Sequence, residues 1–420
     1  MKKITLSLLA ALIAVSGMAQ VKIGKDFSLK IYGQVRTDIF YNSRANTESV
    51  DGLFYSYPKD RVYDENGNDI NSSSSSNMYA VYSRMGFDFA GPMMGKAKTS
   101  AKIEFDFRGN GNDNLSALRL RHAYFNLDWG KSKLLVGQTS HPFFGEVSPQ
   151  ILNLNTGSPF QPFGRAPQIR YRYNSGELQL QAAALWQSQF KSHGPSADNG
   201  TGDGNARNQY PHKNSNVPEI ALGIDYKKDG WIAGVGIDLL SITPRTVAIG
   251  EDDKKYKVDE RLTTVSYEAH VKYTGKDLMV AAKTTLGSNF THTSMLGGYA
   301  VKSVDDKTGE KKYTPFRNSS TWLNIVYGKK WKPGIFLGYI KNLGTESDMI
   351  LGENVYGTGT NIDKLMNGTF ELTYNVPHWK IGVEYTYTAA WYGKNKQDGK
   401  VADTHRVGNN RLVLSATYSF

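Results

Sequence analysis

Positively charged side chains recur in this sequence at positions two apart, a spacing that places both members of a pair on one face of an extended chain. The clearest pairs are Arg119 with Arg121 and Arg170 with Arg172. Further bases fall on the same polar phase of alternating segments, namely Arg36, Arg84, Lys102 and Arg108. Guanidinium groups on one surface attract anions and offer bidentate hydrogen bonds to carboxylates and phosphates. The chemistry expected of this set is recognition of anions.

Acidic residues on the same segments limit that expectation. Asp38, Asp88, Glu104 and Asp106 share the polar phase with the bases, and they can pair with them. A fully paired surface would discriminate only weakly between ions, whereas unpaired bases favour anions. We expect a preference for anions, with full pairing as the alternative.

The sequence offers little support for catalysis. Its histidines show neither metal-ligand nor nucleophile spacing, and each is expected to be a solvated polar residue. They are His122, His141, His193, His212, His270, His292, His378 and His405. The absence of cysteine removes thiolate sites and disulfides, and residues 198–208 lack the ordered spacing of a calcium loop. We expect no enzyme activity, no cofactor and no metal site.

The first residues have the layout of a secretory signal peptide. Lys2 and Lys3 precede an apolar stretch at residues 4–15, and small residues follow it up to Ala19. The stretch is shorter than the about 20 apolar residues of a spanning helix. We expect a signal peptide at residues 1–19 and a mature domain at residues 20–420. In an exported protein, the formal net charge of +11 indicates anionic solutes or lipid A phosphates as partners, and not nucleic acid.

Apolar and polar residues alternate in segments of about ten residues, the length of a tilted membrane strand. In residues 101–108, apolar side chains alternate with Lys102, Glu104, Asp106 and Arg108. Such a charged face cannot lie against a protein core, so it must contact water. With so many such strands, the apolar face must then contact lipid. The same alternation occurs in residues 29–41, 265–273 and 381–391.

About sixteen such segments predict an all-β, antiparallel, up-and-down transmembrane barrel. They lie near residues 28–41, 79–90, 99–108, 117–129, 133–138, 168–173, 177–187, 219–227, 231–242, 262–273, 277–288, 319–328, 334–342, 367–376, 380–391 and 410–420. Short turns, expected in the periplasm, alternate with long polar loops, expected outside the cell. The long loops include residues 42–78, 190–217, 243–261, 289–317 and 391–407.

Residues near the strand ends carry two further signals. Aromatic side chains there are expected to form girdles at the membrane interfaces, and they include Trp129, Trp231, Trp322, Trp379 and Trp391. The last segment ends on Phe420 and resembles the sorting signal read by the outer-membrane insertion machinery. In residues 118–129 the alternation slips after Arg121, and a β-bulge there would restore it.

The third long connection, residues 140–167, is more apolar than the others. Its apolar residues are Phe143, Phe144, Val147, Ile151, Leu152, Leu154, Phe160 and Phe163. Such a loop does not lie extended in water, and a barrel of this size leaves an aqueous lumen. We expect it to fold into the lumen as a constriction, with a cap on the outer rim or at a subunit interface as the alternative. Glu146 and Arg165 complete the predicted set of pore-lining residues.

The run Leu118-Arg-Leu-Arg-His-Ala-Tyr124, the segment Leu135-Val-Gly-Gln138 and the long third loop resemble the DcaP-like family of trimeric outer-membrane porins. They are also similar to the phosphate-selective porins O and P. The resemblance implies a homotrimer, an inward third loop and a preference for anionic solutes, with Arg119 and Arg121 near the constriction. The third loop lacks a lysine-rich stretch, so strict phosphate selectivity is not expected.

These observations predict a porin in the outer membrane of a Gram-negative bacterium, through which small hydrophilic, anionic solutes diffuse passively past a basic constriction. Its expected partners are those solutes, outer-membrane lipid and lipopolysaccharide, the barrel insertion machinery and further copies of the chain. A substrate-specific channel for phosphate or dicarboxylates is one alternative, and saturable conductance would distinguish it. An outer-membrane enzyme or adhesin is the other, and hydrolysis of lipid or peptide would favour the enzyme.

Overall fold

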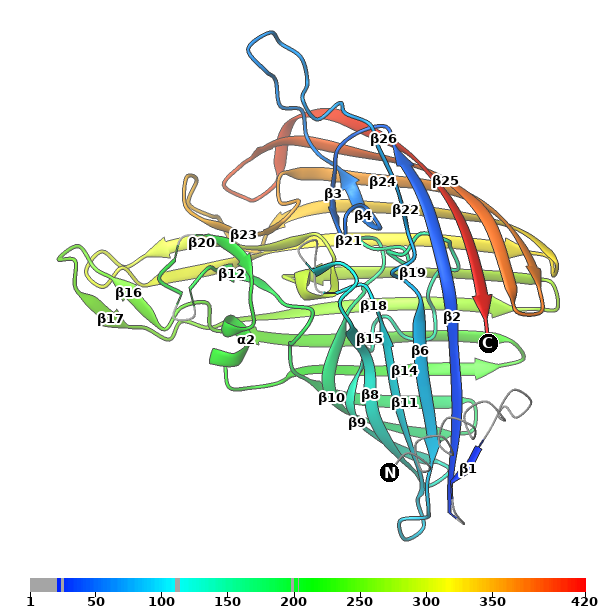
Figure 1. Ribbon diagram of the computed structural model, residues 1–420. Helices are drawn as coiled ribbons and strands as arrows, with labels where there is room; N and C mark the ends of the chain where they lie inside the picture. Colours follow the sequence, from blue (N-terminus) through cyan, green and yellow to red (C-terminus); the bar gives the residue numbers. More distant parts are fainter. Residues whose placement is uncertain (1–20, 24–25, 110–113, 198–199, 203) are drawn as a thin grey trace, which may run out of the picture.

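The computed structural model describes residues 21–23, 26–109, 114–197, 200–202 and 204–420, and one large antiparallel β-barrel dominates it (Figure 1). Sixteen strands form the wall. They are β2 (Phe27–Asn42), β6 (Arg84–Ala90), β7 (Lys98–Asp106), β8 (Arg119–Asp128), β9 (Ser132–Ser140), β10 (Arg165–Ser175), β11 (Leu178–Leu185), β14 (Glu219–Lys228), β15 (Trp231–Ile242), β18 (Leu262–Thr274), β19 (Leu278–Ser288), β21 (Lys311–Tyr327), β22 (Trp331–Thr345), β24 (Ile362–Val376), β25 (Trp379–Asn395) and β26 (Val401–Ser419). Because β2 pairs with β26, the barrel is closed. The predicted fold class is confirmed.

Shorter elements extend this wall or lie in its loops. They are β1 (Val21–Ile23), β3 (Asn46–Ser49), β4 (Phe54–Pro58), β5 (Ser75–Tyr79), β12 (His193–Pro195), β13 (Asn205–Arg207), α2 (Tyr210–Asn214), β16 (Val247–Ile249), β17 (Lys255–Lys257), the 3-10 helix η2 (Thr291–Thr293), β20 (Gly297–Val304) and β23 (Val355–Thr358). None of the described helices is long and apolar enough to cross a bilayer. The predicted signal peptide lies outside the described residues.

The turns at one end of the barrel are tight, and their sequences explain why. Between β14 and β15 only Asp229 and Gly230 separate the paired residues Lys228 and Trp231. Both turn residues have positive φ, 48° for Asp229 and 84° for Gly230. A two-residue turn of this kind matches the twist of antiparallel strands, and Asp-Gly is among its preferred sequences. The local sequence therefore sets the register of this hairpin.

The barrel carries its apolar side chains outside and its polar side chains inside. On β25, Tyr385 and Tyr387 are 46% and 37% exposed, while Thr386 between them is buried. Aromatic pairs mark the end with the tight turns, such as Trp231 with Tyr273 and Trp331 with Tyr374, each with ring centroids 4.8 Å apart. An apolar outer belt with an aromatic border is the arrangement expected of a barrel in a lipid bilayer.

One girdle prediction is wrong. Trp322 is 1% exposed and points into the barrel, where its indole nitrogen donates a hydrogen bond of 2.7 Å to Gln161 Oε1. Its phase on β21 explains the position, because buried Ser320 and Asn324 lie two residues to either side. Trp129, Trp231 and Trp379 are exposed near the tight turns, as expected.

The bulge expected in residues 118–129 is present. The pairing of β7 with β8 runs from Glu104 opposite His122 directly to Phe105 opposite Leu120, so Arg121 is the additional residue. The bulge leaves both Arg119 and Arg121 buried on the inner side while the rest of β8 keeps its alternation.

Two segments expected to be long polar loops are largely β-strand. Residues 391–407 belong mostly to β25 and β26, which pair as far as Asn395 opposite Val401. Residues 289–317 contain η2, β20 and the start of β21. Beyond the membrane both faces of a strand contact water or loops, so the alternation fades while the backbone pairing continues.

Candidate functional site

The third long loop, residues 141–164 between β9 and β10 (called L3 below), lies inside the barrel, as predicted. Wall strands far apart in the barrel hold it. From β21, Ser320 donates a hydrogen bond of 2.8 Å to the Phe160 carbonyl. From β2, Arg36 donates one of 2.5 Å to the Leu152 carbonyl. A cap on the outer rim could not contact inner-wall residues of both strands.

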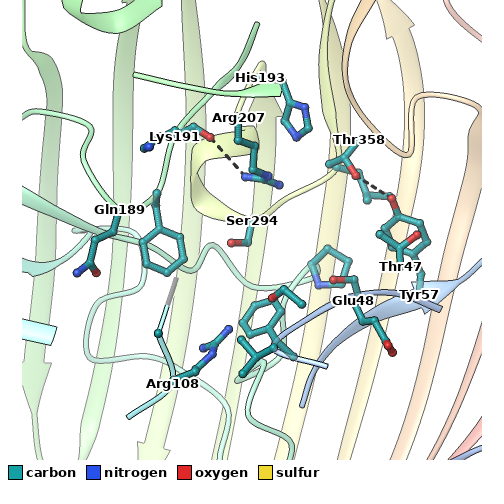
Figure 2. Close-up of a pocket in the computed structure, with 18 of the residues that line it drawn as sticks. Thr47, Glu48, Tyr57, Arg108, Gln189, Lys191, His193, Arg207, Ser294 and Thr358 are labelled. Atoms are coloured by element: carbon teal, nitrogen blue, oxygen red, sulfur yellow. Dashed lines mark hydrogen bonds between the residues drawn. The ribbon is translucent and has the colours of Figure 1, made fainter. Parts of the chain in front are cut away.

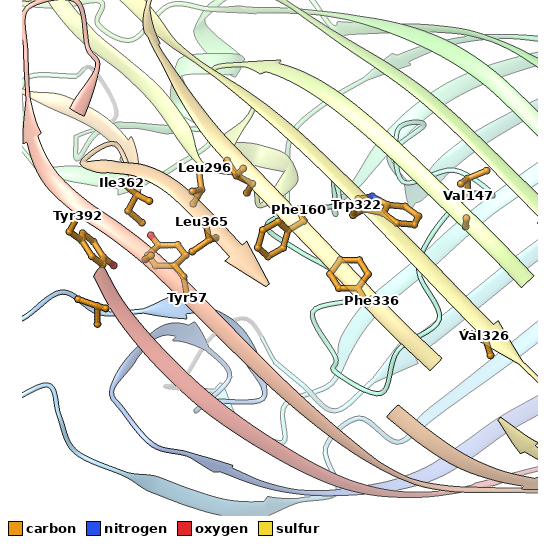
Figure 3. Close-up of a cluster of buried hydrophobic side chains, with 14 of the residues drawn as sticks. Tyr57, Val147, Phe160, Leu296, Trp322, Val326, Phe336, Ile362, Leu365 and Tyr392 are labelled. Carbon is orange, nitrogen blue, oxygen red and sulfur yellow. The ribbon is translucent and has the colours of Figure 1, made fainter. Parts of the chain in front are cut away.

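L3 follows an apolar part of the inner wall, and this explains why it folds inward. Its Val147 and Phe160 belong to a buried cluster with Trp322, Phe336 and Leu365 from β21, β22 and β24 (Figure 3). The Phe160 and Phe336 ring centroids are 6.2 Å apart. Burial of these side chains removes apolar surface of both the loop and the wall from water. The loop and this part of the wall are therefore complementary.

A carboxylate on the wall fixes the middle of L3. Glu384 of β25 is 1% exposed, and its Oε2 accepts hydrogen bonds from the backbone nitrogens of Leu152 at 2.6 Å and of Asn153 at 3.1 Å. Backbone N–H groups that face a carboxylate make strong, charge-assisted hydrogen bonds. Glu384 is thus an anchor for the loop that the sequence analysis did not identify.

Replacement of Glu384 by Gln is expected to loosen L3. An amide cannot accept two N–H groups as strongly as a carboxylate, and one weakened buried bond costs about 1–3 kcal/mol. We expect a lower free energy of unfolding and a noisier open-channel current in planar bilayers. Tyr385→Phe is the matched control, because Tyr385 is the next residue and is 46% exposed on the outer face. Equal noise in both variants would contradict the anchoring role.

The first long loop also enters the barrel, which the sequence analysis did not predict. Its hairpin of β3 and β4 contains the buried residues Phe54, Tyr55 and Tyr57. The Tyr55 carbonyl accepts a hydrogen bond of 2.8 Å from Asn155 of L3, and the Phe54 ring lies 5.6 Å from that of Phe163. Aromatic residues in this hairpin are the signal that could have been used. This hairpin therefore narrows the lumen together with L3.

The basic residues predicted on β2 and β6–β8 are present on one side of the inner wall, and carboxylates pair with most of them. Arg119 makes a bidentate contact with Asp106 at 2.9 and 2.6 Å. Arg121 contacts Glu104 at 2.5 Å and Asp106 at 2.9 Å. The remaining pairs are Arg36 with Asp38 at 2.7 Å, Lys102 with Asp88 at 2.9 Å and Arg84 with Glu104 at 3.8 Å. The pairing considered from the sequence as an alternative thus holds for these five bases.

Four predicted arginines have no carboxylate within 4 Å among the described residues: Arg108, Arg165, Arg170 and Arg172. Arg170 and Arg172 instead donate hydrogen bonds of 2.8 Å to Gln168 and Gln181. Arg108 and Arg165 are 4% and 2% exposed, and two guanidinium nitrogens of each have no hydrogen-bond partner within the part of the chain that the structure describes. The guanidinium of Arg108 lies 4.7 Å from the centre of the Phe54 ring. Burial lowers the pKa of Arg108 to about 9, which keeps it cationic at neutral pH.

Glu146, the single acid in the predicted set, lies apart from these arginines. Its carboxylate pairs with Lys227 of β14 at 2.8 Å, and its side chain is 47% exposed. Its carbonyl also accepts a hydrogen bond from Lys272 of β18 at 3.4 Å. The structure therefore places Glu146 beside lysines of other strands and not beside the basic wall.

A cavity of about 400 Å³ opens where the two inward loops meet the basic wall (Figure 2). Arg108 and Arg119 line it from the basic side, and Pro159 lines it from L3. Across the cavity stands Arg207 of β13, whose guanidinium donates hydrogen bonds to backbone carbonyls, including that of Thr291 at 2.9 Å. Among the described residues, its lining thus contains three guanidinium groups and one carboxylate, that of Glu48. Arg207 was not predicted, because its segment reads as polar loop.

The acid Glu48 is expected to make the charge of this cavity depend on pH. Partial burial raises the pKa of Glu48 above its ordinary value. As the pH falls, Glu48 therefore loses its negative charge at a higher pH than a fully exposed glutamate does. Burial and the charge of Arg207 lower the pKa of His193 to about 4, so this imidazole stays neutral above that value. We therefore expect anion preference to rise as the pH falls through the raised pKa of Glu48. Reversal potentials should show this rise in the His193→Gln variant and not in Glu48→Gln.

The prediction that the histidines are solvated is wrong for several of them. His141, His193, His212 and His292 are buried, with exposures of 9% or less. The sequence spacing gave no signal, because loops and strands far apart in the chain bring these residues together. His141 of L3 and His292 of η2 both contact Glu219 at the start of β14.

A family model described as DcaP outer membrane protein matches residues 16–192. The resemblance to DcaP is confirmed. The outer membrane channel DcaP of Acinetobacter baumannii has a similar structure, with a TM-score of 0.66 and 19% identity, over 96% of this chain and 100% of that one. No curated protein sequence matches the chain.

Other outer-membrane protein structures share the fold at lower identity. The anion-selective porin from Comamonas acidovorans has a TM-score of 0.53 and 10% identity over 94% of this chain and 100% of that one. The trimer form of OmpT from Vibrio cholerae has a TM-score of 0.55 and 12% identity over 94% of this chain and 100% of that one. At these identities the structures establish the porin fold. With the family match, they support an outer-membrane location.

Proposed function

We propose that this protein is an outer-membrane porin through which small hydrophilic, preferably anionic, solutes diffuse passively. One observation carries the proposal. L3 packs on the apolar side of the inner wall, and an open cavity remains beside the basic side, where Arg108 has no carboxylate partner among the described residues. Cationic side chains at a narrow point of a pore favour anions.

The proposed pore-lining set keeps the residues expected from the sequence and gives them different weights. Arg108 and Arg119 lie at the cavity itself. Arg36, Arg84, Lys102 and Arg121 form the paired wall, whose charges largely cancel. The others are Arg165, Arg170, Arg172 and Glu146. We expect the groups without ion-pair partners to dominate the potential that a passing solute meets, because opposite charges in contact cancel at a distance.

Assembly and membrane contacts belong to the same proposal. The apolar outer belt supports contact with lipid, and we propose a homotrimer because a trimer form is known for OmpT, which shares the fold. Lipopolysaccharide at the outer surface and the insertion machinery at the last strand are the further proposed partners. Chemical crosslinking of the purified protein tests the trimer, and a single monomeric band would contradict it.

Planar bilayer recordings test the channel directly. Purified protein should give stepwise conductance, with a reversal potential under a salt gradient that shows preference for chloride over potassium. Absence of conductance steps from correctly folded protein would contradict a channel of any kind. A cation-leaning reversal potential would contradict only the basic constriction.

A substrate-specific channel is the second candidate, and the arginines around the cavity favour it. Arg108, Arg119 and Arg207 surround a volume of about 400 Å³, which suits a small carboxylate or phosphate. Current carried by succinate or phosphate should then saturate with concentration, while chloride current should not. If the current rose linearly with concentration for all three anions, the substrate-specific channel would be contradicted and the passive porin would be supported.

A further inference from the structure

Three segments meet in a buried cluster near the base of L3. His141 begins L3, His292 lies in η2, and Glu219 is the first residue of β14. The Nε2 atoms of both histidines lie 2.8 Å from Glu219 Oε1. The side chains are 2%, 4% and 1% exposed, in that order. The three candidate ligand atoms lie within 4.8 Å of one another, so one ion can reach all of them after small adjustments.

A second carboxylate points into the same cluster without a hydrogen bond of its own. Asp238 of β15 is 1% exposed, and Oδ2 lies 3.5 Å from His141 Nε2. Neither of its oxygens has a hydrogen-bond partner among the residues that the structure describes, and the same holds for the second oxygen of Glu219. Buried carboxylates are costly unless they are paired or bind a cation. A positive charge beside Glu219 and Asp238 would therefore stabilise the cluster.

We propose that His141, His292, Glu219 and Asp238 bind a divalent transition metal ion of the zinc class. Imidazole nitrogens together with carboxylate oxygens are ligands that Zn²⁺ accepts, usually four in tetrahedral geometry. A divalent cation would neutralise the two carboxylates with both imidazoles neutral. Calcium and magnesium prefer sites made of oxygen alone, so they fit this mixed set poorly.

The hydrogen bonds of His141 couple this site to the shape of L3. The backbone N–H of Phe143 donates to His141 Nδ1 at 3.1 Å, so Nε2 carries the ring proton and donates it to Glu219. Coordination through Nε2 moves that proton to Nδ1, and the Phe143 N–H must then turn away. Phe143 is 1% exposed and packs on Phe290, with ring centroids 5.5 Å apart. Metal binding would therefore rearrange the first turn of L3 and link it to η2 and to the wall.

Metal titration of the purified full-length protein in detergent tests this site without any transport assay. After dialysis against a chelator, the protein should take up a single Zn²⁺ per chain, and Ca²⁺ and Mg²⁺ should not compete. Co²⁺ should give the intense visible absorption of a tetrahedral nitrogen and oxygen site. Glu219→Gln and His292→Gln should weaken Zn²⁺ binding about tenfold or more. His270→Gln is the matched control, because His270 also faces two carboxylates, Asp225 at 3.2 Å and Glu268 at 3.5 Å.

The outcomes separate clearly. The site would be supported if Glu219→Gln and His292→Gln lost Zn²⁺ uptake while His270→Gln retained it. No uptake by the wild-type protein, or equal uptake in all variants, would overturn it. If the variants do not fold, the Co²⁺ spectrum of the wild-type protein decides, and a weak octahedral spectrum or none overturns the proposal.

Discussion

Replacement of residues 147–160 in L3 by a short Gly-Ser linker is expected to raise the single-channel conductance severalfold. This stretch includes Val147 and Phe160, which pack on the inner wall, and Leu152 and Asn153, which Glu384 holds. The wall itself closes through the pairing of β2 with β26, which does not involve L3. The sixteen-stranded wall should therefore remain intact, while the lumen becomes wider where L3 narrowed it. Conductance steps in planar bilayers measure the effect.

The same deletion should lower stability, and a control separates the two effects. Without L3, apolar inner-wall residues such as Trp322, Phe336 and Leu365 face water, at a cost of about 25 cal/mol for each Å² exposed. A deletion at residues 251–254 changes the tip of the outer hairpin of β16 and β17, and these two strands form a separate two-stranded sheet in the described structure. It should leave conductance unchanged. Unchanged conductance in the L3 variant would mean that this loop does not limit the pore.

Much of this fold follows from the alternation of side chains, because the membrane imposes one environment on each face of every strand. The pattern predicted all sixteen wall strands, although β21 and β26 begin well before their predicted starts near residues 319 and 410. The phase slip after Arg121 predicted the bulge that the structure contains. Where both faces contact water, as in residues 391–407, the alternation disappears and the strand extension could not be recognised. The apolar content of L3 was enough to predict its inward fold.

The arrangement inside the lumen was less predictable, because it depends on contacts between segments far apart in the chain. Nothing in the local sequence around Arg207 indicates that it faces Arg108 across a cavity. The contact of His141 with His292 likewise requires L3 and η2 to meet. Ion pairing also weakens the role that the sequence suggested for two correctly placed arginines. Arg119 and Arg121 lie on the inner side as expected, but Asp106 and Glu104 neutralise them.

This difference between paired and unpaired arginines leads to opposite effects of two similar substitutions. Arg121→Gln should destabilise the barrel by about 3–5 kcal/mol, because it leaves Glu104 and Asp106 buried with less compensation. Arg108→Gln should leave stability unchanged or raise it, because two of its buried guanidinium nitrogens have no hydrogen-bond partner among the described residues. The temperature at which the folded barrel unfolds in detergent measures both effects.

Selectivity should respond in the reverse order. Arg108 lines the cavity and Arg121 does not, so Arg108→Gln should cause the larger loss of anion preference, measured as the shift in reversal potential under a salt gradient. A buried, unpaired guanidinium costs folding free energy, and its position beside the path of the solute gives that cost a functional explanation. If Arg108→Gln left the reversal potential unchanged, the basic constriction would have to be assigned to other residues. Arg165 would be the next to test, because it is equally buried and two of its guanidinium nitrogens also lack a hydrogen-bond partner in the described part of the chain.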